Sequence, residues 1–215
     1  SGKTRVIVHR MAYLIQAAGI EPHSICAVTF TNKAAREMQE RLSKILGPNG
    51  KGLSCSTFHS LCAMILRREG SVVGLERNFV IYDDDDQMAL IKSALTTEGF
   101  DPKLYNPRVI HNTISAAKAR LVDIEEFGNH AQGPHERIVH QIYQSYQELL
   151  IRNQAVDFDD LLMSTWQLFR KHPTILERYQ SRFSHMLVDE FQDTNVAQYS
   201  LVHQISGYHR NICVV

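Results

Sequence analysis

The 215-residue chain lacks several features that would place it in a membrane or secreted class. Its longest apolar stretches are only a handful of residues, well short of the ~20 that a membrane-spanning helix needs. No basic-then-apolar leader opens the sequence, and its four cysteines form no CxxC pair, so we expect a reduced cytoplasmic protein with no membrane partner. Low-complexity tracts and internal repeats are also missing, and 44% of the residues are hydrophobic, which predicts folded domains rather than a disordered chain.

The net charge is zero, but the charge is unevenly distributed. Residues 1–70 contain ten Lys and Arg against four Asp and Glu, whereas residues 71–215 contain thirteen against nineteen. A basic amino-terminal third favours an anionic ligand there, such as a phosphate or a nucleic acid.

Helical and strand patterns alternate in two parts of the chain. The apolar spacing of residues 1–68 predicts helix, strand, helix, strand and helix, and the alternation returns after residue 157 with a buried strand at 186–188. The part between about 85 and 155 shows no strand alternation; helices are predicted near its two ends, separated by a stretch broken by Pro and Gly. We therefore predict an α/β parallel sheet flanked by helices, built from residues 1–70 and 156–215, with a mostly helical inserted subdomain at 71–155.

Two short motifs indicate phosphate chemistry. Gly2-Lys3-Thr4 at the head of a helix matches the end of a phosphate-binding loop, in which the lysine reaches the β- and γ-phosphates and the threonine ligates Mg²⁺. Asp189-Glu190 ends an apolar strand, which places two carboxylates at the sheet edge where ligands of such sheets bind. Each motif alone is also explained by ordinary surface charges, but their joint occurrence in one α/β chain favours an ATPase.

Five longer motifs follow one another along the chain. They are Ser1-Gly2-Lys3-Thr4-Arg5, Thr29-Phe30-Thr31-Asn32-Lys33-Ala34-Ala35, Ser56-Thr57-Phe58-His59, Asp157-Phe158-Asp159-Asp160-Leu161 and Leu187-Val188-Asp189-Glu190-Phe191-Gln192-Asp193-Thr194. Their order is that found in superfamily 1 DNA helicases, and the chain closely resembles the UvrD/Rep/PcrA group of that superfamily over essentially all of its length. The resemblance is weakest between about residues 97 and 135.

The resemblance implies a RecA-like P-loop NTPase fold and a role for each matching residue. Ser1, Gly2, Lys3 and Thr4 would bind ATP, with Arg5 near the nucleotide base. Thr4 and Asp189 would hold Mg²⁺, Glu190 would act as catalytic base, and Gln192 would couple hydrolysis to movement. The residues that would border the single-stranded DNA are Phe30, Thr31, Asn32, Thr57, Phe58 and His59.

A DNA track at these positions has a physical rationale. Single strands are bound by aromatic faces that stack on bases and by small polar groups that contact phosphates. Phe30 and Phe58 each stand beside such groups at a predicted strand-to-helix junction. The alternative is that both rings belong to the core and that Thr31 and Thr57 only cap helices.

Other polar clusters favour structural interpretations. The four acids at 83–86 precede a helix, where they would cap it and complement its dipole. Asp157, Asp159 and Asp160 precede another helix and match a structural motif of the family. His130, His135 and His140 are interrupted by Gly-Pro and joined by no cysteine, which favours a solvated loop over a zinc site.

The function implied by the resemblance is ATP-dependent 3′-to-5′ translocation on single-stranded DNA and unwinding at single-strand/duplex junctions, in repair or replication restart. The family uses a second motor domain of the same parent chain, whose trans-acting arginines can supply ~10³–10⁵ in rate. We therefore expect these 215 residues to be nearly inactive by themselves. A non-catalytic binding module and the motor half of a helicase–nuclease are the alternatives.

Overall fold

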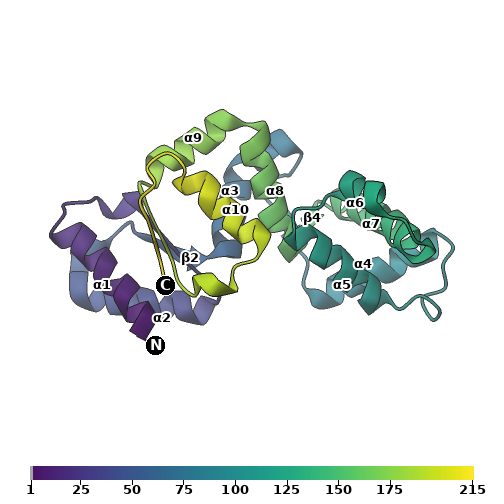
Figure 1. The fold of residues 1–215 in the computed structure, drawn as a ribbon, viewed down its shortest axis with the longest axis horizontal. Helices are drawn as coiled ribbons and strands as arrows, with labels where there is room; N and C mark the ends of the chain where they lie inside the picture. The colour runs from purple at the N-terminus through teal and green to yellow at the C-terminus, as the bar shows by residue number, and fades with distance from the viewer. Residues whose placement is uncertain (1) are drawn as a thin grey trace. The chain divides into compact units, whose positions relative to one another are not determined.

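The computed structural model describes residues 2–215, which form two compact units (Figure 1). The first unit contains residues 2–64 and 166–215, and the second contains residues 65–165. Both boundaries between these units fall inside continuous helices, α3 (Phe58–Glu69) and α8 (Phe158–Lys171). Apolar spacing alone does not mark such a boundary, because it is unbroken along each helix.

A four-stranded parallel sheet forms the centre of the first unit, as predicted. Its strands lie in the order β2-β1-β5-β6, and the register pairs Thr29 with Thr57 and Val28 with Val188. All five residues of β1 are buried, which is typical of a central parallel strand covered on both faces. The strands are β1 (Ile25–Thr29), β2 (Ser54–Thr57), β5 (His185–Val188) and β6 (Ile212–Val214).

Helices cover both faces of this sheet. One face packs Ile25, Ala27 and Leu187 against buried side chains of α1 and α2, whereas α10 contacts β5. The cysteines in the described part of the chain are all free, and three of the four are buried. The remaining helices of the unit are α1 (Gly2–Gln16), α2 (Asn32–Leu46), α9 (Pro173–Arg182) and α10 (Val196–Ser206), with short 3₁₀ turns at Pro22–Ser24, Gly47–Gly50 and Phe191–Asp193.

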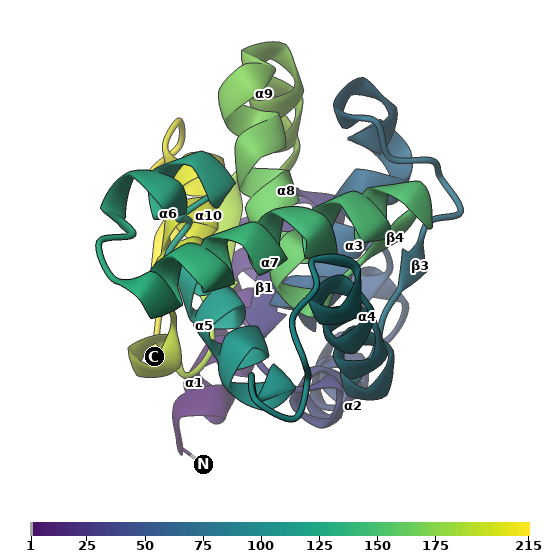
Figure 2. The ribbon, with the colours of Figure 1, turned by 90° about the vertical axis from the view of Figure 1, so that its right-hand side faces the viewer.

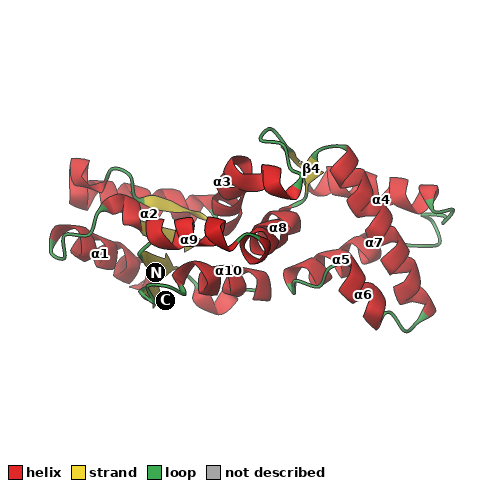
Figure 3. Cartoon of the chain, turned by 90° about the horizontal axis from the view of Figure 1, so that it is seen from above, coloured by secondary structure: helices red, strands yellow, loops and turns green. Residues whose placement is uncertain are grey.

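The second unit is mostly helical (Figures 2 and 3). Its core is formed by one face each of α4, α5 and α7. None of the helices in residues 2–215 combines the length and apolar character needed to cross a bilayer. The elements are β3 (Val80–Ile81), α4 (Asp84–Thr97), α5 (Pro107–Ala119), α6 (Ile124–His130), α7 (Pro134–Arg152) and β4 (Ala155–Val156), preceded by a 3₁₀ turn at Gly70–Val73.

Two helices lie where the sequence predicted a stretch broken by Pro and Gly. Pro107 occupies the first turn of α5, where its missing N–H costs nothing, and Asn106 caps that helix. Gly128 lies within α6, where a Cβ atom would come within 2.6 Å of His140 Nε2. Pro107 therefore starts α5, and Gly128 permits His140 to pack closely against α6 without interrupting that helix. The parallel pairing of β3 with β4 was also missed, because each strand has only two residues.

The acids at residues 83–86 form a helix cap, as predicted. The Asp83 carboxylate accepts hydrogen bonds from the backbone N–H groups of Asp85 and Asp86, both at 3.0 Å. The Asp86 carboxylate accepts one in return from the Asp83 N–H at 3.3 Å, which completes a capping box. These carboxylates thus satisfy the free N–H groups at the start of α4.

A buried lysine pairs with the second acidic motif. The Lys118 ammonium is 1% exposed and lies 2.7 Å from Asp157 Oδ2 and 2.8 Å from Asp160 Oδ1. The Tyr146 hydroxyl donates to Asp157 at 3.0 Å, and the Gln147 amide donates to Asp160 at 3.1 Å. We call these five residues the Lys118 cluster. It fixes the end of α5 to the beginning of α8 and to α7.

The two carboxyl groups of this cluster have different acidities. Burial and the neighbouring charge of Asp157 raise the pKa of Asp160 to about 6. Burial also acts on Asp157, but the Lys118 charge outweighs it and holds the pKa of that carboxyl below its ordinary value. The Lys118 ammonium thus serves both carboxylates, and Asp160 holds its proton more tightly than Asp157 does.

We expect the free energy of unfolding of the native chain to fall relative to that of an Asp160→Asn variant as the pH rises from about 4 to about 7. The folded state keeps the Asp160 proton up to about pH 6, whereas the unfolded chain releases it near pH 4. Above that window the native protein contains a buried carboxylate that the variant lacks. Urea unfolding of both proteins at about pH 4.5 and 7.5 measures the change, with the exposed Asp85→Asn as control. A native-minus-variant difference independent of pH would contradict the raised pKa.

Candidate nucleotide and DNA site

The predicted functional residues lie at one edge of the parallel sheet. Because parallel strands end at the same edge, Phe30 after β1, Phe58 after β2 and Asp189 after β5 all follow the carboxyl ends of neighbouring strands. The strand order places β1 between β2 and β5. The candidate DNA residues therefore occupy two adjacent strand ends, and the acidic pair occupies the next one.

Lys3 meets the acidic motif although the two are far apart in sequence. Its Nζ donates to Gln192 Oε1 at 3.0 Å and lies 3.4 Å from Glu190 Oε2. The Gln192 amide in turn donates to Glu190 Oε2 at 2.6 Å. The cation, the carboxylate and the amide thus form one hydrogen-bonded triangle, of which the Lys3 and Glu190 side chains are 50% and 36% exposed. The triangle is open to an incoming ligand.

Thr4 and Asp189 form a second contact beside the first. The Thr4 hydroxyl donates to Asp189 Oδ2 at 3.0 Å. Asp189 is only 1% exposed, and its other carboxylate oxygen, Oδ1, is buried without a hydrogen-bond partner. A buried carboxylate oxygen without a partner is costly unless a cation or donor meets it.

This pair of oxygen ligands fits Mg²⁺. Mg²⁺ prefers oxygen ligands and is bound in nucleotide sites through one or two protein groups, with phosphates and waters completing the octahedron. The residues 2–215 contain no cluster of three His, Cys, Asp or Glu side chains that could hold a metal by themselves. A hydroxyl and a carboxylate are nevertheless the two protein ligands that a phosphate-bound magnesium ion requires.

The backbone turns sharply where β5 ends. Glu190 adopts a left-handed conformation, with φ 53° and ψ 43°, which is uncommon for a residue with a side chain. The flanking backbone holds this turn, because Asp189 N–H donates to Val28 O at 3.0 Å and Phe191 N–H donates to Val215 O at 2.8 Å. A strained residue held in place by the sheet on both sides is a frequent feature of functional sites.

The Glu190 carboxyl is more acidic than an ordinary glutamate. The hydrogen bond from the Gln192 amide is the main cause of the lowered pKa, and the Lys3 charge acts in the same direction. Both partners stabilise the ionised carboxylate. Glu190 is therefore a carboxylate at neutral pH, able to accept a hydrogen bond from a water molecule.

Gly2 and Arg5, the other described residues of the predicted phosphate loop, form no hydrogen bond or ion pair with this triangle. Gly2 begins α1, and a Cβ atom there would meet nothing within 4 Å, so no neighbour in the described chain requires glycine. Arg5 is exposed on the same helix and has no ion pair with a described residue. Ser1 lies outside the described residues. The structure thus brings together Lys3, Thr4, Asp189, Glu190 and Gln192.

The two candidate DNA-stacking rings differ in exposure. Phe30 is half-buried, whereas Phe58 is only 2% exposed. The rings meet edge to face, with centroids 5.7 Å apart and planes at 61°. Phe58 as placed here offers almost no surface to a base, and it supports the Phe30 ring from inside the first unit.

The polar residues beside these rings cap the following helices. Thr31 Oγ1 accepts a hydrogen bond from Ala34 N–H at 3.1 Å at the start of α2, and Thr57 Oγ1 accepts one from Ser60 N–H at 3.1 Å at the start of α3. Thr31 and Asn32 are exposed, whereas Thr57 is 6% exposed. Burial lowers the pKa of His59, which favours its neutral form. The capping role therefore holds for both threonines and leaves Thr31 and Asn32 accessible.

Sequence reasoning missed the lysine of the Lys118 cluster. Lys118 follows Ile114 by four residues, so it lies on the buried face of α5 beside Ala117. A lysine on the apolar side of a helix was the available signal that one of the acidic motifs has a buried partner.

Comparison with known proteins identifies the family of the chain. The chain matches the UvrD/REP helicase N-terminal domain over residues 1–215. It is 50% identical over 215 residues to the ATP-dependent DNA helicase PcrA of Bacillus subtilis, covering all of this chain and 29% of that protein. It is 46% identical, again over its whole length, to PcrA helicases of Staphylococcus aureus and Staphylococcus epidermidis, of which it covers 30%.

The chain thus spans about 30% of the length of these curated relatives. A match to this family along the entire sequence agrees with the RecA-like parallel sheet of the first unit. The chain belongs to the UvrD/REP helicase N-terminal domain family.

Proposed function

We propose that this chain is the ATP-binding motor part of an ATP-dependent DNA helicase that translocates on single-stranded DNA. The observation that carries the proposal is the hydrogen-bonded triangle of Lys3, Glu190 and Gln192, beside the Thr4–Asp189 contact. A lysine, a buried aspartate and a partly exposed glutamate at one sheet edge are the groups that hydrolysis of a nucleoside triphosphate needs. The names of the relatives, ATP-dependent DNA helicase PcrA, support the same activity.

Lys3 would exchange its present partners for phosphate oxygens when ATP binds. Among the described residues, one amide oxygen and one carboxylate hold its half-exposed ammonium. Once Lys3 turns to the β- and γ-phosphates, Glu190 loses the cation that helps to lower its pKa. The carboxylate then becomes a better base for the attacking water, while Gln192 keeps it oriented through the 2.6 Å hydrogen bond. Nucleotide binding would thus both position the substrate and raise the basicity of Glu190.

Thr4 and Asp189 are the residues that would hold Mg²⁺. The Thr4 hydroxyl and the unpartnered Asp189 Oδ1 supply oxygen ligands at the same place. When bound, the ion would neutralise charge on the phosphates. Gly2 and Arg5 would complete the nucleotide site by their positions at the start of α1, and Ser1 is proposed for it on its sequence motif alone.

The DNA contact is proposed for the ends of β1 and β2. Phe30 offers a half-exposed face for stacking, and Thr31 and Asn32 lie exposed at the amino terminus of α2, where backbone N–H groups attract phosphates. Thr57, Phe58 and His59 would support this surface from the second strand end. Because β5 pairs directly with β1, a structural change at the nucleotide site would reach the DNA surface through these two strands.

The complete protein would contain a second motor domain that closes over the nucleotide. The chain covers about 30% of its relatives, which leaves ample length for such a domain. We propose 3′-to-5′ movement, action at single-strand/duplex junctions in repair or replication restart, and negligible activity of these 215 residues alone. ATP hydrolysis by the complete protein, with and without an oligonucleotide of single-stranded DNA, tests the proposal. Hydrolysis that single-stranded DNA leaves unchanged would contradict it.

Replacing Phe30 by Ala should weaken single-stranded DNA binding of the complete protein by about 5- to 150-fold, the equivalent of losing one stacked base. Phe30→Tyr keeps the ring and should bind nearly as the native protein does. Fluorescence titration of an oligothymidine at several salt concentrations measures both affinities, and the salt dependence should persist in both variants because it comes from phosphate contacts. Native affinity and translocation in Phe30→Ala would show that the ring serves only the core.

A further inference from the structure

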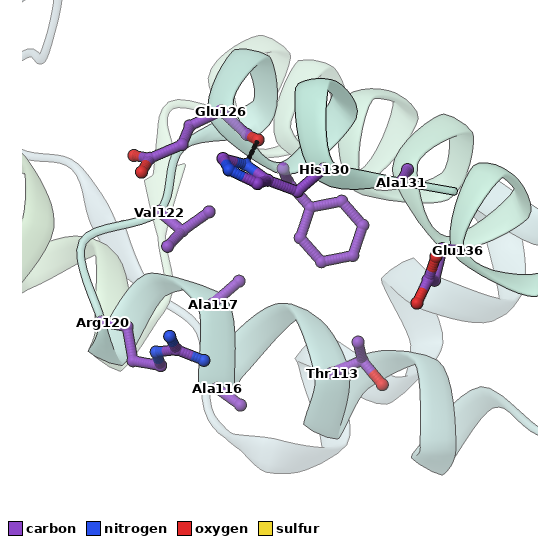
Figure 4. Close-up of a pocket in the computed structure, with 10 residues that line it drawn as sticks. Thr113, Ala116, Ala117, Arg120, Val122, Glu126, His130, Ala131 and Glu136 are labelled. Carbon is purple, nitrogen blue, oxygen red and sulfur yellow. Dashed lines mark hydrogen bonds between the residues drawn. The ribbon is translucent and has the colours of Figure 1, made fainter. Parts of the chain in front are cut away.

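A groove of about 470 Å³ opens between α5 and α6 in the second unit (Figure 4). Its walls include Ala116 and Ala117 from α5, Arg120 at the carboxyl-terminal cap of α5, Glu126 and Phe127 from α6, and Glu136 from the first turn of α7. The volume lies within the range of roughly 300–1,000 Å³ that is typical of ligand sites. None of these residues belongs to the nucleotide or DNA site proposed above.

The floor of the groove is apolar and firmly supported. Ala116 and Ala117 have small side chains, so space remains between α5 and α6. Phe127 is half-buried and meets the buried Tyr143 ring edge to face, with centroids 6.1 Å apart and planes at 86°. A supported aromatic ring beside small side chains suits a large apolar side chain of a partner.

The groove is lined by more carboxylate groups than guanidinium groups. Arg120 and Glu126 lie on opposite walls (Figure 4), and neither forms an ion pair with any residue in the described part of the chain. The Glu136 carboxylate accepts hydrogen bonds from the Gln132 and Gly133 N–H groups, both at 2.8 Å. Those bonds, chiefly the one from Gly133, lower the pKa of Glu136 and keep it ionised. The walls of the groove therefore carry two carboxylates and one guanidinium, with Glu136 at the other end of the groove from Arg120 (Figure 4).

The excess of carboxylates over guanidinium groups in the groove favours some classes of ligand and disfavours others. A nucleic acid would bring its phosphates against two carboxylates, which is unfavourable. A segment with a cationic side chain gains from the unpaired Glu126. Arg120 retains donors for a main-chain carbonyl or carboxylate of the same segment.

We propose that the groove docks a segment of a partner protein in which a Lys or Arg stands close to a large apolar side chain. The apolar side chain packs on Phe127 and the two alanines, and the cation pairs with Glu126 across from Arg120. Because the groove is open along the surface between two helices, an exposed segment can enter it without rearrangement of the second unit.

Titration of the isotope-labelled 215-residue chain with short synthetic peptides tests the proposal. The probe is a Gly/Ser-flanked peptide containing Leu and Lys two residues apart, compared with peptides carrying Leu→Ser or Lys→Glu. The first should shift the amide resonances of Ala116, Ala117 and Phe127, and the other two should bind at least about fivefold more weakly. Absence of shifts at these residues with every peptide would overturn the proposal.

Variants of the chain distinguish a contact with Glu126 inside the groove from an effect of the total charge of α6. Glu126→Gln should weaken the Leu–Lys peptide about fivefold, whereas Glu125→Gln, also exposed in the first turn of α6 but outside the groove, should leave it unchanged. Ala116→Trp, on the exposed side of α5, should fill the groove and abolish the shifts at Ala117 and Phe127 while the circular dichroism spectrum stays native. Equal weakening by both glutamine variants, or single-stranded DNA that shifts the same residues and displaces the peptide, would refute a protein-docking groove.

Discussion

In the complete protein, Glu190→Gln should lower ATP turnover by about 10²- to 10⁴-fold, the range that a positioned general base contributes. Glutamine has nearly the same shape, and its side-chain oxygen can still accept the hydrogen bond that the Gln192 amide makes at 2.6 Å. It cannot take a proton from the attacking water. Lys3, Thr4 and Asp189 are untouched by the change, so ATP binding should remain within a few-fold of native.

Single-turnover hydrolysis and a titration with a fluorescent ATP analogue separate these two quantities. Glu177→Gln on α9 is the matched control, since it makes the same chemical change on an exposed residue of the first unit and should leave both quantities unchanged. Wild-type turnover in Glu190→Gln would remove this residue from the role of base. Loss of nucleotide binding instead would indicate that the charge of Glu190 chiefly holds Lys3 in place.

The parallel sheet was predictable because its physical signals are local. Ile25–Thr29 is short, apolar and followed by a capping threonine, and Met186–Val188 ends directly in two acids. Each pattern predicts a strand that ends at a site, and parallel strands end at one edge. The meeting of Lys3 with Glu190 was therefore expected from the two motifs before any distance was known, whereas the place of Gln192 beside them was implied only by the family resemblance.

The helical insertion was only partly predictable, because its signals act over long distances. Gly128 looked like a helix breaker, and only the approach of His140 from α7 explains it. Lys118 has its partner Asp157 39 residues further along the chain, so no local pattern pairs them. Phe30 and Phe58 occur in similar motifs, yet one ring is half-buried and the other 2% exposed, a difference that depends on how the two strand ends pack together.

Lys118→Met should destabilise the chain by about 3–5 kcal/mol, the cost of breaking a buried ion pair from one side. Methionine fills similar space, so the main loss is the cation that lies 2.7 Å from Asp157 and 2.8 Å from Asp160. The two carboxylates would then share a buried site with only the Tyr146 hydroxyl and the Gln147 amide as donors. At least one of them must take up a proton at neutral pH, and this uptake limits the loss.

Urea unfolding of the 215-residue chain measures this effect, and two further variants show its origin. Lys92→Met makes the same change on the exposed side of α4 and should alter stability by no more than about 0.5 kcal/mol. The triple variant Lys118→Met/Asp157→Asn/Asp160→Asn removes all three charges together and should be more stable than Lys118→Met alone, because no unpaired charge remains buried. If the single and triple variants lose the same stability, the cost comes from packing around the methionine and not from carboxylates left without their cation.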